Sequence, residues 1–222
     1  IASNAGPYCP GSTIQLNSSG GTGYAWSGPS AYSNATQNPT IASCTLANDG
    51  IYTVTVTNAS GCTATATTTV TVVNTSSSTA TNTGPYCVGQ TISLSSTGGG
   101  TGYAWTGPNS FSNATQNPGI PSSTMAMSGA YSVTITFTGG CTSSATTSVT
   151  VNSLPTAPII TPGGPTTFCS GNSVNLSSSY SSGNTWSTSA TTQLITVNAT
   201  GIYVVTYTDG NGCTSSASQL VT

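Results

Sequence analysis

A strand motif that occurs three times sets the strongest limit on how this chain can fold. Each copy begins with Gly-x-Tyr, continues with alternating apolar and small polar residues, and closes on Gly-Cys, over residues 50–62, 129–141 and 201–213. Alternation with a period of two is typical of a β-strand with one buried face. A second Thr- or Ser-rich alternating run follows each Gly-Cys. Each copy therefore predicts a β-hairpin with a cysteine at its turn, in a chain built from repeats.

The repeats predict the division of the chain into domains. Proline-studded residues 153–165 should form an extended, semi-rigid linker at the start of the third repeat. The polar stretch 73–81 is either a linker or the first strand of the second repeat. The expected domains are residues 1–73, 74–152 and a shorter one at 153–222.

The composition excludes several classes of function. The chain has no Lys, Arg or His, so it lacks the side chains that bind nucleic-acid phosphates or an anionic membrane surface. It has no apolar run of about 18 residues, the length needed to insert into a membrane as a helix. Without His or Lys it has no ordinary general base, and its only acidic residues, Asp49 and Asp209, lie in turn sequences. We expect no enzyme activity, no cofactor and no metal.

The first residues show neither an initiator methionine nor a basic segment followed by an apolar stretch. We therefore expect a processed chain or a piece of a longer one.

The seven cysteines predict a disulfide framework. Each repeat has one cysteine just before its second strand and one at the hairpin turn. We expect each of these two cysteines to pair within its own repeat, as Cys9–Cys62, Cys87–Cys141 and Cys169–Cys213. Such a framework is typical of extracellular or periplasmic proteins. Zinc binding is the competing interpretation, but the chain contains no CxxC pair and no histidine.

One cysteine, Cys44, is left without a partner in this scheme, and Ser123 is its counterpart in the second repeat. Two interpretations remain open: a buried free thiol, or a link to another molecule.

Several motifs together resemble a known family. They are Cys-x-Gly-x-[ST]-[IV]-x-Leu, Tyr-x-Trp-[ST]-Gly-Pro, Gln-Asn-Pro, Gly-x-Tyr-x-Val-x-[VI] and Gly-Cys. The chain resembles the Ig-like and PKD-like repeats of very large secreted surface proteins of the Bacteroidetes, including adhesins of the gliding-motility, type 9 secretion kind. The resemblance implies an all-β fold of three tandem Ig-like or PKD-like β-sandwich domains, each with one disulfide. It also implies that the Gly-x-Tyr motif at the start of the late strand is similar to the tyrosine corner of Ig sandwiches. We assign Trp26, Trp105 and Trp186 to the cores.

These features favour an extracellular structural protein at the cell surface, as a stalk segment of an adhesin or a filament subunit. The near absence of charge leaves little repulsion against self-association, and the strand edges lack protective lysines. The expected partners are copies of the chain or neighbouring repeats of a longer one. Assembly by strand addition would use Ile1, Ala2, Ser3 and Asn4, or the end at Val221 and Thr222.

The alternative is a glycan-binding adhesin module. Tyr32 and Phe111 lie in the Gly-Pro loops of the first two repeats, where exposed aromatic faces could stack on surface sugars. Packing against the core is the competing role for both side chains.

Overall fold

The computed structural model of the chain describes residues 1–75 and 78–222. The described residues form β-strands and three single-turn 3-10 helices, and no α-helix occurs among them. No helix in this part of the chain is long and apolar enough to cross a membrane. The fold consists of two compact units, each considered separately below. The first holds residues 1–81, 94–118 and 130–147, and the second holds residues 82–93, 119–129 and 148–222.

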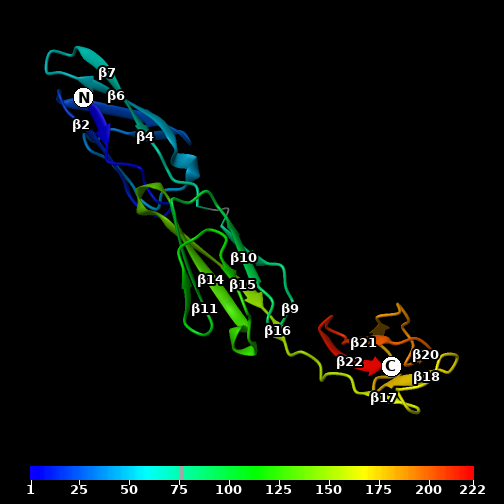
Figure 1. Ribbon diagram of the computed structural model, residues 1–222. Helices are drawn as coiled ribbons and strands as arrows, with labels where there is room; N and C mark the ends of the chain where they lie inside the picture. Colours follow the sequence, from blue (N-terminus) through cyan, green and yellow to red (C-terminus); the bar gives the residue numbers. More distant parts are fainter. Residues whose placement is uncertain (76–77) are drawn as a thin grey trace. The chain divides into compact units, whose positions relative to one another are not determined.

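The first repeat contains two sheets, both within the first unit. One has three strands in the order β1-β2-β5, and the other has four in the order β4-β3-β6-β7 (Figure 1). Their bounds are β1 (Ala2–Asn4), β2 (Ile14–Ser18), β3 (Gly23–Gly28), β4 (Tyr32–Asn34), β5 (Thr40–Ile41), β6 (Gly50–Thr57) and β7 (Thr63–Val70), with η1 (Leu46–Asn48) before β6. This strand order is that of an Ig-like sandwich.

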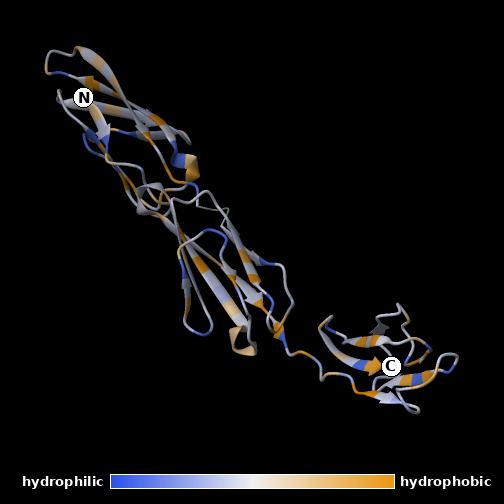
Figure 2. Cartoon of the chain, viewed as in Figure 1, coloured by the Kyte–Doolittle hydropathy of each residue, from blue (hydrophilic) through white to orange (hydrophobic). Residues whose placement is uncertain are grey.

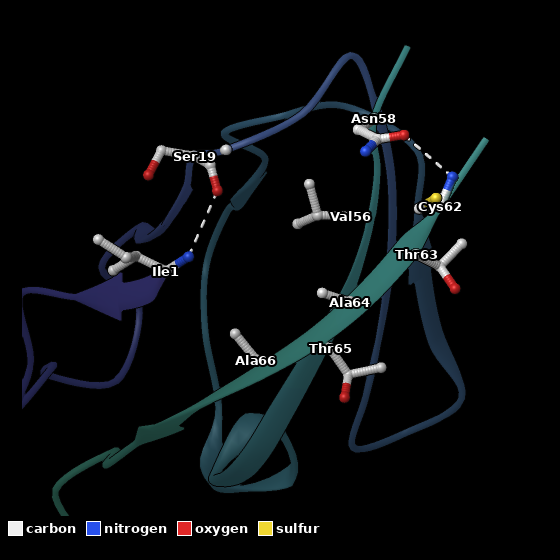
Figure 3. Close-up of a pocket in the computed structure, with 10 residues that line it drawn as sticks. Ile1, Ser19, Val56, Asn58, Cys62, Thr63, Ala64, Thr65 and Ala66 are labelled. Atoms are coloured by element: carbon white, nitrogen blue, oxygen red, sulfur yellow. Dashed lines mark hydrogen bonds between the residues drawn. The ribbon is translucent and has the colours of Figure 1, made fainter. Parts of the chain in front are cut away.

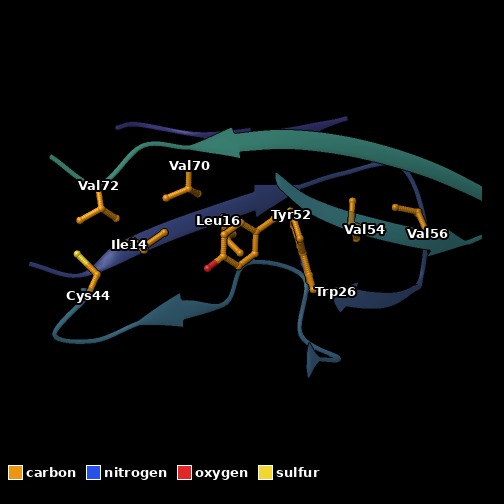
Figure 4. Packing of buried hydrophobic residues seen from close by; sticks show 9 residues of the cluster. All are labelled: Ile14, Leu16, Trp26, Cys44, Tyr52, Val54, Val56, Val70 and Val72. Carbon is orange, nitrogen blue, oxygen red and sulfur yellow. The ribbon is translucent and has the colours of Figure 1, made fainter. Parts of the chain in front are cut away.

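The core of the first repeat lies between these sheets. Along β6 every second residue is buried, which places Tyr52, Val54 and Val56 on the inner face. Ile14 and Leu16 of β2 meet them from the other sheet, and Trp26 fills the centre as the sequence predicts (Figure 4). In Figure 2 orange, hydrophobic bands are separated by paler ones along several strands. The period-two pattern thus forms the inner faces of the sandwich.

The second repeat has the same strand order. Its sheets run β13-β10-β8 and β12-β11-β14-β15, with a parallel pair of β16 and β9. The bounds are β8 (Thr79–Asn82), β9 (Tyr86–Cys87), β10 (Ile92–Thr97), β11 (Gly102–Gly107), β12 (Phe111–Asn113), β13 (Gly119–Ile120), η2 (Met125–Met127), β14 (Gly129–Thr136), η3 (Thr138–Gly140), β15 (Thr142–Val149) and β16 (Val151–Asn152). Residues 79–81 of the polar stretch lie in β8, so this part of the stretch is the first strand of the second repeat rather than a linker. Ser76 and Ser77, also part of that stretch, lie outside the described residues.

The third repeat, within the second unit, is a smaller sandwich. Its sheets run β17-β18-β20 and β19-β21-β22. The bounds are β17 (Ile160–Pro162), β18 (Val174–Ser178), β19 (Asn184–Trp186), β20 (Leu194–Val197), β21 (Gly201–Thr208) and β22 (Thr214–Val221). Trp186 is again buried in the core. Within the described residues nothing corresponds to β4, because this repeat lacks the Gly-Pro excursion. The segment 153–165 is a linker only in part, since three of its residues form β17.

The Gly-x-Tyr motif forms a tyrosine corner, as the resemblance implies. The Tyr52 hydroxyl donates a hydrogen bond of 3.1 Å to the backbone carbonyl of Asn48, four residues earlier. In the third repeat Tyr203 donates to the carbonyl of Ala199 at 3.0 Å. These bonds tie the start of β6 and of β21 to the preceding turn, as in Ig sandwiches.

Candidate functional site

Two disulfides link successive repeats. In the first unit Cys9 is bonded to Cys141, with 5.3 Å between their Cα atoms. In the second unit Cys87 is bonded to Cys213, with 5.6 Å between the Cα atoms. Each bond joins the cysteine before the second strand of one repeat to the hairpin cysteine of the following repeat. The junctions between repeats are therefore the chemically distinctive sites of the chain.

The predicted pairing within each repeat is wrong. In the first repeat Tyr8 pairs in parallel with Val72, beyond the carboxyl end of β7, whereas Cys62 precedes the amino end of β7. An eight-residue strand separates the two ends by about 25 Å. A disulfide requires Cα atoms within about 7 Å, so Cys9 cannot reach Cys62. The same holds in the second repeat, where Tyr86 pairs with Val151 at the far end of β15 from Cys141.

The first cysteine of each repeat lies in a turn of constant geometry, which we call the leading turn. The residue three positions further on donates its backbone N–H to the cysteine carbonyl at 3.0, 3.0 and 3.2 Å in the three repeats. The glycine two positions after the cysteine has a positive φ of 84°, 91° and 94°. Glycine adopts this conformation without a steric penalty. The leading turns contain Cys9 with Gly11, Cys87 with Gly89, and Cys169 with Gly171.

The second cysteine of each repeat lies in the hairpin turn. In the first repeat the side chain of Asn58 accepts hydrogen bonds from the backbone N–H groups of Ser60 and Cys62, each at 2.9 Å. In the third repeat the carboxylate of Asp209 accepts the same two bonds from Asn211 and Cys213, also at 2.9 Å. Asp209 is thus a turn former, as the sequence predicts.

Three cysteines carry no disulfide within the described residues. Cys44 is fully buried, whereas Cys62 and Cys169 are exposed. The buried position of Cys44 removes it as a link to another molecule. Sequence reasoning assigned Cys62 and Cys169 to internal bonds and so missed them as free, exposed cysteines.

A pocket of about 280 Å³ lies beside Cys62 (Figure 3). Its walls come from the hairpin turn, the first residues of β7 and the amino terminus, where the Ile1 ammonium group donates to the carbonyl of Ser19. The lining includes Ile1, Ser19, Val56, Asn58, Cys62 and Ala64. The thiol of Cys62 is therefore accessible at the edge of a hollowed surface.

The residues proposed for glycan contact pack against the tyrosine corner. The ring of Tyr32 meets Tyr52 edge to face at 5.4 Å between centroids, and the ring of Phe111 meets Tyr131 in the same way at 5.5 Å. Both side chains are half-buried. The Tyr32 hydroxyl is buried without a hydrogen-bond partner in the described part of the chain. The nearby Asn34 oxygen already accepts two hydrogen bonds from Thr36.

The proposed assembly strand already has a partner. Ala2, Ser3 and Asn4 form β1 and pair antiparallel with β2. The side chain of Asn4 donates to the hydroxyl of Thr68 and the carbonyl of Thr69, both at 2.8 Å. These residues belong to the sandwich of their own repeat.

The other acidic residue, Asp49, also has a structural contact. Its carboxylate accepts a hydrogen bond of 2.7 Å from the backbone N–H of Val72. In the second repeat the hydroxyl of Ser128 accepts the corresponding bond from Val151 at 2.9 Å. Both groups hold the end of the last strand of their repeat, and no other acidic residue lies beside Asp49 in the sequence.

The strand order and the tyrosine corner define a tandem Ig-like protein. Solved structures that match the chain include three amino-terminal domains of the Highly Immunogenic Outer Capsid protein of bacteriophage RB49, at 16% identity and a TM-score of 0.46, covering 98% of this chain and 79% of that one. The eight amino-terminal Ig domains of the Down Syndrome Cell Adhesion Molecule match at 15% identity and a TM-score of 0.44, covering 96% and 34%. Ig domains 1–4 of Sidekick-1 match at 15% and 0.31, covering 97% and 70%. The sequence matches no protein-family model, and no curated protein is similar to it.

Proposed function

We propose that the chain is an extracellular structural protein, a stalk segment of a surface adhesin or a subunit of a filament. The observation that carries this proposal is the pair of disulfides that cross the junctions between repeats. A covalent bond across a junction restricts how two successive repeats can separate. Such a restriction suits a load-bearing spacer.

The same bonds support an extracellular location. Disulfides form and persist outside the reducing cytosol, in secreted and surface proteins. The nearly uncharged, Thr- and Ser-rich surface supports a role in packed assemblies, because little electrostatic repulsion opposes contact between copies.

The chemistry of the chain supports a non-enzymatic role. Its two acidic side chains both hold the backbone: Asp49 accepts a hydrogen bond from Val72 at the end of the last strand of the first repeat, and Asp209 accepts one from Cys213 in the hairpin turn. The chain has no His, Lys or Arg to act as a base or to stabilise an anion.

The structure gives strand addition less support than the sequence does, because β1 is paired with β2. A neighbouring chain could accept Ile1, Ala2, Ser3 and Asn4 only if β1 first left its own sheet. Glycan contact by Tyr32 and Phe111 receives less support as well, because both rings pack on tyrosines of their own sheet.

Negative-stain electron microscopy of the native material tests the proposal. We expect regular filaments, or extended particles that carry several repeats in line. A chain that remains a compact single particle under all oxidising conditions and at high concentration would contradict the proposed role. A variant lacking residues 1–5 tests strand addition through the amino terminus and keeps all four bonded cysteines. Because the deletion also removes β1 from its own sheet, the unfolding temperature of the variant is the control.

A further inference from the structure

Each disulfide joins the leading turn of one repeat to the hairpin turn of the next, so one leading-turn cysteine and one hairpin-turn cysteine are left without an internal bond. Three leading turns and three hairpin turns are joined by two bonds, from the first repeat to the second and from the second to the third. Cys62 in the first hairpin turn and Cys169 in the third leading turn remain, both exposed. We propose that copies of this chain join end to end through a disulfide between Cys169 of one copy and Cys62 of the next. The inference rests on the proposed structural function and deepens it.

The backbone around Cys169 has the geometry that forms a bond elsewhere in the chain. Asn172 donates to its carbonyl at 3.2 Å, as Ser12 does for Cys9 at 3.0 Å. Gly171 has a φ of 94°, close to the 84° of Gly11. Cys169 thus presents its side chain from the same turn as the two leading cysteines that are bonded.

The backbone around Cys62 likewise reproduces a bonded hairpin turn. Asn58 donates its N–H to the carbonyl of Cys62 at 2.9 Å, and Asp209 does the same to Cys213 at 2.9 Å. The glycine before each cysteine has a φ of 81°. Within the described residues Cys213 is bonded to a leading turn, whereas Cys62 is not.

Around each of the two disulfides, the proline before the leading turn lies near the hairpin turn of the next repeat. In the first unit Pro7 lies so close to Gly139 that a Cβ atom on this glycine would come within 2.8 Å of the proline ring. In the second unit Pro85 and Asn211 line a common crevice. Gly139 and Asn211 each precede the bonded hairpin cysteine by two residues, the position held by exposed Ser60 in the first repeat. The exposed surface around Ser60 therefore corresponds to the surface that a proline of the preceding repeat lies near in the other two hairpin turns.

The pocket beside Cys62 has a filled counterpart in the third repeat. Ala64, which lines the pocket, corresponds to Ser215, the second residue after the hairpin cysteine. The Ser215 hydroxyl donates to the carbonyl of Pro155 at 2.6 Å, and Tyr180 donates to the carbonyl of Thr156 at 2.9 Å. The chain arriving from the preceding repeat thus passes beside this hairpin turn. At the first hairpin turn, the end of another copy would approach the same surface.

One difference limits the likeness of the new junction to the other two. The third leading turn lacks the Gly-Pro pair that directly precedes Tyr8 and Tyr86. Its surroundings instead form an open pocket of about 460 Å³ that includes Pro165 and Phe168. The cysteines, rather than an identical apolar contact, therefore carry the proposed link.

The reaction is a two-electron oxidation that needs a disulfide oxidant. The thiolate of one cysteine attacks an oxidised small-molecule disulfide and releases one thiol, forming a mixed disulfide. The thiolate of the other copy then attacks that mixed disulfide and releases the second thiol. Two protein thiols thus lose two protons and two electrons, and one oxidised disulfide becomes two thiols. Both thiols are exposed, as the exchange requires.

The test uses the purified chain with both internal disulfides formed, incubated in a glutathione redox buffer. Non-reducing gel electrophoresis should show a ladder in steps of 21.8 kDa that collapses on full reduction. Cys62→Ser and Cys169→Ser should each abolish the ladder. An equimolar mixture of the two variants should give a dimer and nothing larger, because each partner then has one reactive end. Cys44→Ser should keep the whole ladder.

Mass spectrometry should locate the new bond between a labelled and an unlabelled chain. Chymotrypsin is the suitable protease, because the chain has no Lys or Arg for trypsin. Homodimers of either single variant, a bond from Cys62 to Cys169 within one chain, or a wild-type chain that stays monomeric with both thiols free would overturn the inference. If the variants still form filaments in the microscope and unfold at the wild-type temperature, the structural function stands and only the disulfide link fails.

Discussion

The thiol of Cys44 donates a hydrogen bond to the backbone carbonyl of Cys9 at 3.2 Å. In the second repeat the hydroxyl of Ser123 donates the same bond to the carbonyl of Cys87 at 3.0 Å. Cys44 and Ser123 are both almost completely buried. The odd cysteine therefore acts as a hydrogen-bond donor that fixes a leading turn, and a serine does the same work one repeat later.

Replacing Cys44 by serine should leave stability nearly unchanged, because a hydroxyl can make the bond that the thiol makes. Ser123→Ala should cost about 1 kcal/mol, because it removes a buried hydrogen bond to Cys87. Urea titration of both variants measures the difference. A large loss in Cys44→Ser would mean that the sulfur is needed for packing rather than as a donor.

The offset disulfides predict which cysteine substitutions destabilise the chain. Cys141→Ser opens a bond that spans 132 residues, and loop-closure entropy puts its contribution at about 5 kcal/mol. Cys62→Ser should leave the free energy of unfolding unchanged, because Cys62 has no internal bond in the described structure. Denaturant unfolding under non-reducing conditions measures both. Equal losses for the two variants would restore the pairing within repeats.

Substitutions of Tyr32 distinguish a role in packing from a role in sugar binding. Tyr32→Ala should lower stability by about 2 kcal/mol, because it removes a half-buried ring in edge-to-face contact with Tyr52. Tyr32→Phe should keep or raise stability by about 1 kcal/mol, because the hydroxyl is buried without a partner among the described residues. Thermal unfolding measures both. An alanine variant with an unchanged midpoint would return Tyr32 to the list of possible sugar contacts.

The buried tyrosines predict how stability depends on pH. Burial raises the pKa of the Tyr52 and Tyr131 hydroxyls above the ordinary value of 10.0. Above about pH 10 the unfolded chain therefore loses these protons more readily than the folded one, and stability falls as pH rises. Without histidine, the chain should show little change between about pH 5 and 7.

Tyr52→Phe provides the control for this dependence. It should lower stability by about 1 kcal/mol at neutral pH, through loss of the bond to Asn48, and should make the alkaline decline shallower. Unfolding followed by circular dichroism across the pH range tests both. An alkaline decline as steep as in the wild type would show that other groups cause it.

Features that depend on local sequence could be predicted. The alternation in 50–57 placed Tyr52 and Val54 on a buried face because side chains of a strand alternate between its two sides. Trp26 could be assigned to the core because few large apolar residues were available to fill it. The tyrosine corner was implied by the family resemblance, and the carbonyl that accepts its hydrogen bond lies only four residues before Tyr52.

Features that depend on distant contacts could not be predicted. The cysteine positions within one repeat do not specify which repeats meet, and connectivity cannot be deduced from sequence alone. The parallel pairing of Tyr8 with Val72 is the missing fact, because it places Cys9 a full strand away from Cys62. Similarly, the short run of β1 carries no signal that separates pairing with its own sheet from pairing with a neighbour.

The disulfide from Cys9 to Cys141 also determines how the molecule would respond to tension. If Ile1 and Thr222 are pulled apart, force passes from the first leading turn directly into the second repeat, and from Cys87 directly into the third. The greatest extension is then set by residues 1–9, 87–141 and 213–222. The other two segments, 10–86 and 142–212, join the same pairs of linked cysteines but are longer than 87–141, so they cannot be pulled straight. An oxidised chain would thus be far less extensible than its 222 residues allow, and reduction would release the hidden length.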